Sequence, residues 1–166
     1  SVLVVTPADQ TIADQAEFIA SVQQAIVQAA HGNIVILGVT PDKPETGYGY
    51  IRTEQSSIAP HGAIPLQVIS FVEKPDLQTA QQYLSEGGYY WNAGMFVLKA
   101  SVWLAAIEQF ASVIFQATST AWDVRKTDGV FVRPGKAEFE AIPSESVDYA
   151  VMERCPGSTF PIQMVP

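Results

Sequence analysis

The sequence predicts an α/β protein in which a mixed, mostly parallel sheet is flanked by helices. Residues 1–6 and 33–40 are continuous aliphatic runs, typical of strands buried on both faces. Between them, residues 11–30 place apolar side chains at helical spacing, and Gly32 stands where a helix stops. This order of strand, helix and strand is a βαβ unit, which implies parallel pairing and a right-handed crossover.

The remaining elements follow from the same kinds of pattern. Segments 48–55 and 66–74 alternate apolar and polar residues, so we expect an antiparallel pair around a loop at 56–65. Further along, we expect a helix over 76–86 capped by Asp76, and an aromatic loop that leads into a strand within 89–99. We then expect a long helix over 100–118, a short helix over 144–154 capped by Ser144 or Ser146, and a final strand over 160–166.

Composition indicates one globular domain and excludes several functions. The 166 residues are 48% hydrophobic and 16% charged, and the net charge of −8 argues against non-specific binding to nucleic acid or an anionic membrane. No apolar run approaches the ~20 residues of a membrane span. Cys155 is the only cysteine, so no disulfide forms within the chain, and we expect a cytoplasmic protein without a signal peptide.

Both ends of the sequence lie inside strand-like runs, and the first residue is not methionine. A chain seldom begins inside a central strand. We therefore expect residues 1–166 to be part of a larger domain.

Three polar groups follow predicted strands, where ligands bind in open α/β sheets: Asp9, the loop 41–49, and Glu73 with Lys74. Asp9 suits two roles equally well, as a Mg²⁺ ligand beside a phosphate or as the cap of a helix beginning near Thr11. The pair Glu73 and Lys74, taken alone, is most typical of a solvated ion pair of little energetic weight.

Two further motifs suit a sugar ligand. In GGYYWNAGMF, aromatic side chains can wall a sugar pocket and the Asn92 amide can both donate to and accept from hydroxyls, although a turn flanked by core aromatics gives the same pattern. Gly49 either permits close backbone approach or marks an ordinary turn. Asp148, between Val147 and Tyr149, needs a partner if it is buried, whereas we expect Glu153 to face solvent.

The motifs VVTPADQ, PETGYGYI, FVEKPD, YYWNAGMFVLKASVWL and ESVDYAVMER occur here in this order. Together they resemble the nucleotidyltransferase domain of bacterial mannose-1-phosphate guanylyltransferases, over nearly the whole chain. The resemblance implies a Rossmann-like nucleotide-diphospho-sugar transferase fold lacking its N-terminal strand–helix units. It also implies an enzyme that forms GDP-mannose and pyrophosphate from GTP and mannose 1-phosphate, with Mg²⁺ as cofactor.

The family pattern implies a role for each matched residue. Asp9 would bind Mg²⁺, and with Lys74, which holds the sugar phosphate, it would form the catalytic pair. Glu73 and Asn92 would bind sugar hydroxyls, Gly49 would contribute backbone contacts, and Asp148 would lie near the substrate in a role left open. On this view Glu73 and Lys74 serve two ends of one ligand rather than each other.

The sequence also departs from the family pattern. The glycine-rich N-terminal signature is absent, a second metal-binding aspartate would lie beyond Pro166, and Gln10 replaces a usual histidine. We therefore expect the isolated chain to be inactive, and its first strand to lack a neighbour and favour a homo-oligomer. A nucleotidyltransferase for another sugar 1-phosphate, or a noncatalytic regulatory module that binds a sugar nucleotide, remains an alternative.

Overall fold

The computed structural model describes residues 1–54 and 64–166, so most of the loop expected at 56–65 lies outside it. The elements in chain order are β1 (Val2–Val5), α1 (Gln15–Ala30), β2 (Ile34–Val39), β3 (Tyr50–Thr53), β4 (Leu66–Val72), α2 (Leu77–Glu86), β5 (Tyr89–Lys99), α3 (Ala100–Phe110), α4 (Ser112–Asp123), β6 (Lys126–Asp128), β7 (Phe131–Arg133), α5 (Lys136–Glu140), α6 (Val147–Ala150), the 3₁₀ helix η1 (Met152–Arg154) and β8 (Ile162–Val165). Within these ranges no helix is long and apolar enough to cross a membrane.

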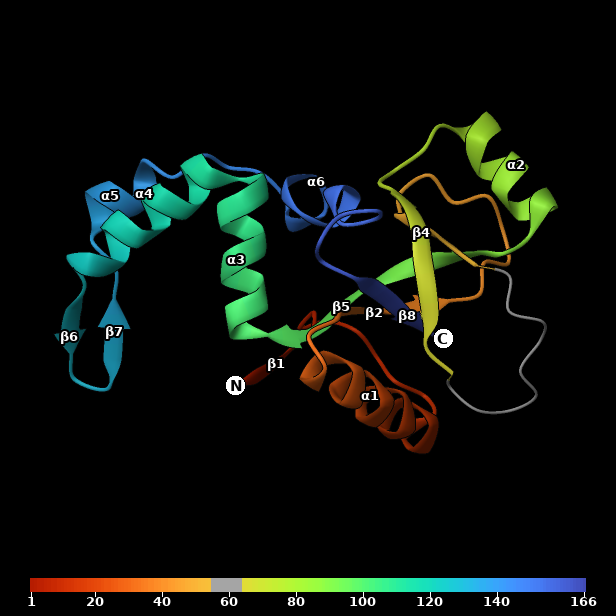
Figure 1. Cartoon of the computed structure of the whole chain (residues 1–166), viewed down its shortest axis with the longest axis horizontal. Helices are drawn as coiled ribbons and strands as arrows, with labels where there is room; N and C mark the ends of the chain where they lie inside the picture. The colour runs from red at the N-terminus through yellow and green to blue at the C-terminus, as the bar shows by residue number, and fades with distance from the viewer. Residues whose placement is uncertain (55–63) are drawn as a thin grey trace.

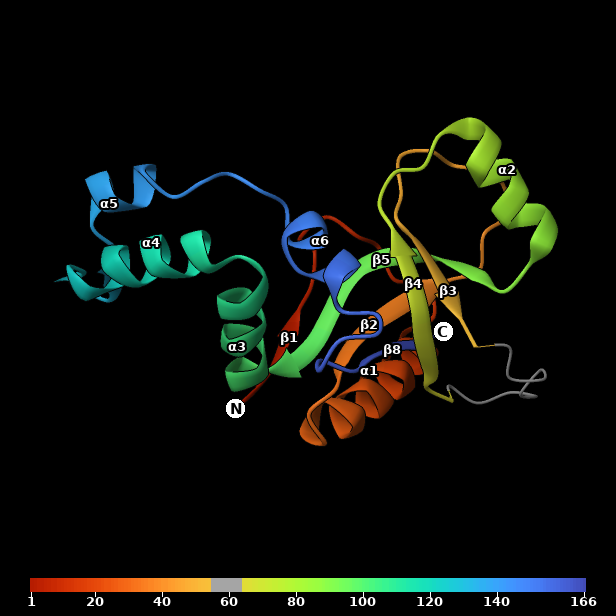
Figure 2. The same ribbon diagram turned by 45° about the horizontal axis from the view of Figure 1, so that its top comes forward.

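The main sheet has the strand order β1-β5-β2-β8-β4-β3, and an additional β3–β5 pairing closes its last five strands into a small barrel (Figures 1 and 2). Only β2–β8 is parallel among the described pairings of this sheet. The α/β class is confirmed, but the expectation of a mostly parallel sheet is wrong. β1 and β2 do run in the same direction, yet β5 lies antiparallel between them.

The β2 strand is buried on both faces, as its unbroken apolar run predicts. Ile34 and Ile36 join the cluster beneath α3, α6 and η1, whereas Val35 and Leu37 join the cluster beneath α1. The same pattern in β1 predicts burial that the structure does not show, because most of that strand is exposed.

The β5 strand is the longest in the barrel and includes the aromatic segment expected to be a loop. It pairs with β1, β2 and β3. Between the β2 partners Ile36 and Gly38, its register advances from Phe96 to Asn92, so β5 carries extra residues there as a bulge. Gly94 has φ +68° within this bulge, a conformation that favours glycine.

The first helix begins later than its sequence pattern predicts. Asp14, rather than a residue before Thr11, is its N-cap, and the Asp14 carboxylate accepts a hydrogen bond of 3.0 Å from the Glu17 N–H. Gly32, with φ +100°, follows the end of the helix as expected. The cap predicted at Asp76 is confirmed, because its carboxylate accepts a hydrogen bond from the Thr79 N–H. Of the two candidates Ser144 and Ser146, the cap is Ser146, whose hydroxyl accepts from the Tyr149 N–H.

The helix expected over 100–118 is broken at Ala111 into α3 and α4, and the Arg154 guanidinium donates to the Phe110 carbonyl at the break. Beyond it, α4, the β6–β7 hairpin and α5 form an arm that extends away from the barrel (Figure 1). No proline or glycine occurs near Ala111 in the sequence, so the local pattern gives no signal for the break.

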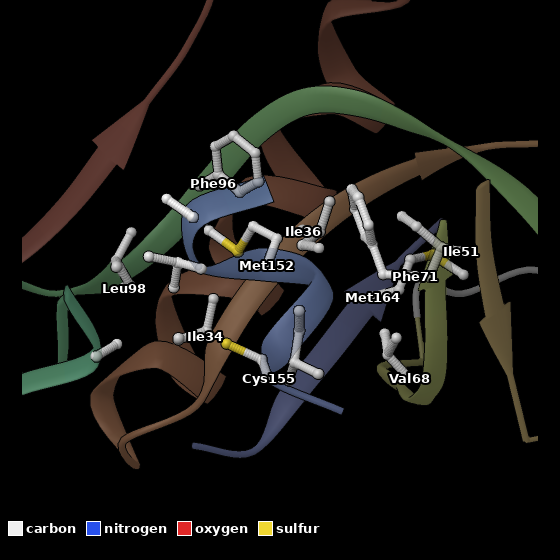
Figure 3. Close-up of a cluster of buried hydrophobic side chains, with 14 residues drawn as sticks. Ile34, Ile36, Ile51, Val68, Phe71, Phe96, Leu98, Met152, Cys155 and Met164 are labelled. Atoms are coloured by element: carbon white, nitrogen blue, oxygen red, sulfur yellow. The ribbon is translucent and has the colours of Figure 1, made fainter. Parts of the chain in front are cut away.

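The largest core cluster joins the inner faces of β2, β4, β5 and β8 to the turn that carries η1. Met152 and Cys155 point among these side chains (Figure 3) and are 0% and 1% exposed. Burial raises the pKa of the Cys155 thiol to about 12. This turn is therefore anchored in the core on both sides of Glu153.

The outer edge of β1 is an apolar strand edge. Val4 and Val5 are 46% and 47% exposed, and β5 is the only strand paired with β1 in the described parts of the chain. Unpaired apolar edges favour pairing with another chain.

We predict that the chain self-associates through β1 and that Val4→Lys shifts it toward monomer, because a charged side chain on an edge strand opposes pairing. Sedimentation velocity over a concentration series would measure this. Val113→Lys is the control, since Val113 is exposed on α4 away from this edge. A wild-type chain that remains monomeric throughout the series would refute the prediction.

Candidate active site

The backbone that follows β4 forms a sharply fixed corner at Glu73, Lys74 and Pro75. The Glu73 N–H donates to Glu153 Oε1 at 2.8 Å, and the Lys74 N–H donates to the Tyr48 carbonyl at 3.3 Å. Lys74 has φ +49° and is the only non-glycine residue with positive φ in the described ranges. Such a strained backbone persists only where the surroundings hold it, and it is often found at functional sites.

The Glu73 carboxylate is buried at this corner, with only 7% of its side chain exposed. Its Oε1 lies 2.9 Å from Lys74 Nζ, whereas Oε2 is buried and has no hydrogen-bond partner in the described structure. The two side chains therefore do contact each other, contrary to the expectation that they serve only a ligand. An unpaired buried carboxylate oxygen is costly, and a ligand hydroxyl would satisfy it.

Gly49 makes the position of Glu73 possible. A Cβ placed on Gly49 would lie 2.5 Å from Glu73 Oε2 and 3.1 Å from the Phe71 ring. Its carbonyl accepts a 2.8 Å hydrogen bond from the Asn92 N–H. Gly49 is thus required for space, and it joins the end of β4 to the bulge of β5.

Asn92 is oriented by both ends of its amide. Oδ1 accepts from the Gly94 N–H at 2.9 Å, and Nδ2 donates to Asp148 Oδ1 at 3.1 Å. Burial, and then the negative charge of Glu73, raise the pKa of Asp148 above its ordinary value. The structure therefore brings together five of the predicted residues at one place: Gly49, Glu73, Lys74, Asn92 and Asp148.

Asp9 lies apart from this group, in the exposed loop after β1. The alternative that it caps α1 is excluded, because Asp14 is the cap. Its loop is nevertheless attached to the bulge of β5: Gln10 Nε2 donates to the Ala93 carbonyl at 2.8 Å, and Pro7 lies 3.5 Å from a Cβ placed on Gly94.

The described residues contain no group of three or more His, Cys, Asp or Glu side chains that would hold a metal ion. A single exposed carboxylate such as Asp9 fits Mg²⁺, which is commonly held by one or two carboxylates together with substrate phosphates and water. A single carboxylate does not fit a metal ion whose ligands must all come from the protein.

A cavity of about 830 Å³ opens beside the bulge, which is within the usual range for small-molecule sites. Its wall includes Gln10, Gly38, Tyr48, Trp91 and Asn92. The rings of Tyr48 and Trp91 meet edge to face, with centroids 5.2 Å apart. Among the predicted binding residues, Asn92 lines this cavity. Its hydrogen bonds to Asp148 and to the Gly49 carbonyl link the cavity wall to the corner at Glu73.

Sequence reasoning missed Glu153. It was expected to face solvent, but it is half-buried and fixes the Glu73 amide. The two residues are 80 positions apart, so no local pattern could have shown their contact.

The profile of the nucleotidyl transferase family matches residues 1–137. The chain belongs to this family.

Its curated relatives include the xanthan biosynthesis protein XanB of Xanthomonas campestris pv. campestris, which is 46% identical over 152 residues. They also include the mannose-1-phosphate guanylyltransferase of Escherichia coli K12, which is 43% identical over 152 residues. These matches cover 92% of this chain and 31% and 32% of the relatives. The chain thus spans about a third of their length.

Two solved structures have the same fold. One, described as a mannose-6-phosphate isomerase from Helicobacter pylori, is 32% identical with a TM-score of 0.84, covering 99% of this chain and 60% of that one. The other, described as a mannose-1-phosphate geranyltransferase from Thermus thermophilus, is 27% identical with a TM-score of 0.80, covering 99% and 44%. The chain is therefore a member of the nucleotidyl transferase family that is related to bacterial mannose-1-phosphate guanylyltransferases, as its motifs indicated.

We predict that Gly49→Ala destabilises the fold by about 1–3 kcal/mol, as expected for overpacking a filled site, because the added methyl group would collide with Glu73 Oε2. Thermal denaturation measures the change. Gly47→Ala is the matched control, since its nearest contact would be Glu45 Oε1 at an ordinary 3.7 Å. Equal melting temperatures for the two variants would show that Glu73 does not depend on Gly49.

The raised pKa of Asp148 predicts a pH dependence of stability. The folded state binds the Asp148 proton more tightly than the unfolded state, so this group favours folding at low pH and loses its contribution as pH rises from about 3.8 through the higher native pKa. Asp148→Asn removes the charge and leaves an amide oxygen for Asn92.

The advantage of Asp148→Asn over wild type should therefore grow with pH across this window and then level off. Melting temperatures measured from pH 3 to 8 would show it. Glu145→Gln, at an exposed carboxylate two residues before α6, is the matched control substitution. A flat difference for Asp148→Asn would contradict the predicted shift.

Proposed function

We propose that this chain provides the sugar-phosphate half of a site that forms GDP-mannose and pyrophosphate from GTP and mannose 1-phosphate. In this reaction a phosphate oxygen of mannose 1-phosphate attacks the α-phosphorus of GTP, and pyrophosphate leaves. One observation carries the proposal: Glu73 keeps a buried carboxylate oxygen that has no partner within residues 1–54 and 64–166, and it lies beside Lys74, a half-exposed cation held on a strained backbone.

Each residue at the corner then has a distinct task. Glu73 Oε2 accepts from a sugar hydroxyl, and the remaining hydrogen-bonding capacity of Asn92 serves a neighbouring hydroxyl. Gly49 lets the backbone lie close to the sugar.

Lys74 turns from Glu73 to the phosphate when the ligand arrives. In the free chain the pKa of Lys74 is raised, first by its hydrogen bond to Glu73 and then by the charge of Glu73. The cavity beside Asn92 has room for the rest of a nucleotide sugar.

Asp9 is the proposed Mg²⁺ ligand. The bound ion would neutralise phosphate charge during the displacement at phosphorus. The contribution of the chain is to hold the Asp9 loop against the bulge of β5 through Gln10 and Ala93. Gln10, the neighbour of Asp9 in the sequence, lines the same cavity as Asn92, which supports a role for this loop beside the ligand.

We predict that the isolated chain does not form GDP-mannose. Two polyanions must meet in the transition state, yet Lys74 is the single cation among proposed site residues that otherwise carry the carboxylates of Asp9, Glu73 and Asp148. Chromatographic detection of product from GTP, mannose 1-phosphate and Mg²⁺ is the measurement. Turnover by the chain alone would show that these residues suffice.

Binding is the direct test of the proposed function. Calorimetry with GDP-mannose, with and without Mg²⁺, should show binding that weakens about tenfold or more in Lys74→Ala, the range expected when a charge-assisted contact is lost. Lys74→Gly should weaken binding equally while preserving the positive φ, which separates the amine from the backbone.

Lys126→Ala, at an exposed residue of the β6 strand in the arm, is the control for general charge effects. Wild-type affinity in both Lys74 variants would refute the assignment of the phosphate to this residue. Tighter binding of GDP-glucose than of GDP-mannose would favour another sugar 1-phosphate.

A further inference from the structure

We propose that Glu153 is a positioning residue: it fixes the corner that carries Glu73 and Lys74, and the segment from α6 to η1 aligns this corner with Asn92. The inference rests on the proposed function, because it concerns how the same site recognises its sugar.

One short segment makes hydrogen bonds to both of the predicted sugar-binding residues, to the side chain of Asn92 and to the main chain of Glu73. At one end, Asp148 Oδ1 accepts from Asn92 Nδ2 at 3.1 Å, and at the other, Glu153 Oε1 accepts from the Glu73 N–H at 2.8 Å. Asn92 lies on β5, whereas Glu73 follows β4. The two acidic side chains belong to the same short stretch of chain, so this segment sets the relation between two strands.

The segment is itself held in place. Met152 is 0% exposed and Cys155 is 1% exposed in the core (Figure 3). Arg154 donates to the Phe110 carbonyl at the end of α3. Glu153 therefore projects from a turn whose neighbours are fixed on both sides, and its carboxylate has little freedom to drift from the corner.

The sheet supplies no acceptor for the Glu73 amide. The last β3–β4 partners before the corner are Tyr50 and Val72, so the Glu73 N–H lies just beyond the ladder. A buried amide needs a partner, and Glu153 supplies a charged one, which makes a stronger hydrogen bond than a neutral acceptor. Together with the Lys74 N–H bond to Tyr48, this bond holds Lys74 at positive φ.

The consequence is sugar selectivity. Mannose and glucose differ only in the orientation of the hydroxyl at C2, so two hydrogen-bonding groups discriminate between them only if their separation is fixed. Loss of Glu153 would release Glu73 relative to Asn92, lowering affinity and allowing both sugars to be accepted.

Calorimetry with GDP-mannose and GDP-glucose on the whole chain tests this consequence. Glu153→Ala should weaken GDP-mannose binding about tenfold, the loss typical of a charged hydrogen bond, and should bring the two affinities closer together. Glu153→Gln retains an acceptor oxygen at the same reach and should restore both values to within about twofold. Glu145→Ala, at an exposed carboxylate just before α6, should leave both unchanged.

Amide hydrogen exchange in the free chain supplies a readout that needs no ligand. The Glu73 and Lys74 amides should be protected in wild type and in Glu153→Gln, and should exchange about tenfold faster or more in Glu153→Ala. Glu153→Asp, which keeps the charge but is one methylene shorter, should resemble the alanine variant and replaces it if the latter does not fold.

Unchanged exchange at Glu73 in Glu153→Ala and Glu153→Asp would overturn the proposal. Faster exchange with unchanged affinity and selectivity would overturn it too, because Glu153 would then be merely structural. If wild type binds neither sugar nucleotide, the proposed function fails, and the exchange data still decide whether Glu153 holds the corner.

Discussion

The pairing of β5 with β3 is the constraint on which the site depends. By closing the barrel it places the Asn92 N–H on the Gly49 carbonyl, and Gly49 in turn determines where Glu73 can lie. The segments that carry Gly49, Glu73 and Asn92 are distant in sequence, and they meet because β5 pairs with strands on both of its sides. Without this closure the corner after β4 would be an ordinary strand end.

Several features of the site lower the stability of the folded chain, and packing of the core must offset this cost. A carboxylate oxygen is buried without a partner among the described residues, Asp148 is held near a like charge, and Lys74 occupies a strained conformation. Each of these features is unfavourable in isolation, and all three lie within one small region. The large cluster that includes Met152 and Met164 lies directly beneath, so rigid packing is adjacent to the strain that it maintains.

The sequence predicted what depends on local chemistry and missed what depends on distant partners. The caps at Asp76 and Ser146 and the stop at Gly32 follow from short-range hydrogen bonds and backbone freedom, and they were found. The antiparallel β5 between β1 and β2 was missed, because an apolar run indicates burial but not the identity or direction of its neighbours. The five residues gathered at the corner were singled out by their residue types and positions, and their roles were assigned from family motifs. Glu153 instead acts through a contact that only the folded chain creates.

The buried thiol of Cys155 gives the molecule a built-in reporter of opening. With its pKa raised to about 12 and its side chain in the core, it presents almost no reactive thiolate while the turn after η1 is packed. An alkylating reagent would therefore modify the chain only as fast as this turn opens. Since the chain has a single cysteine, the rate of that one covalent modification would measure how often the turn that carries η1 and Glu153 unfolds locally.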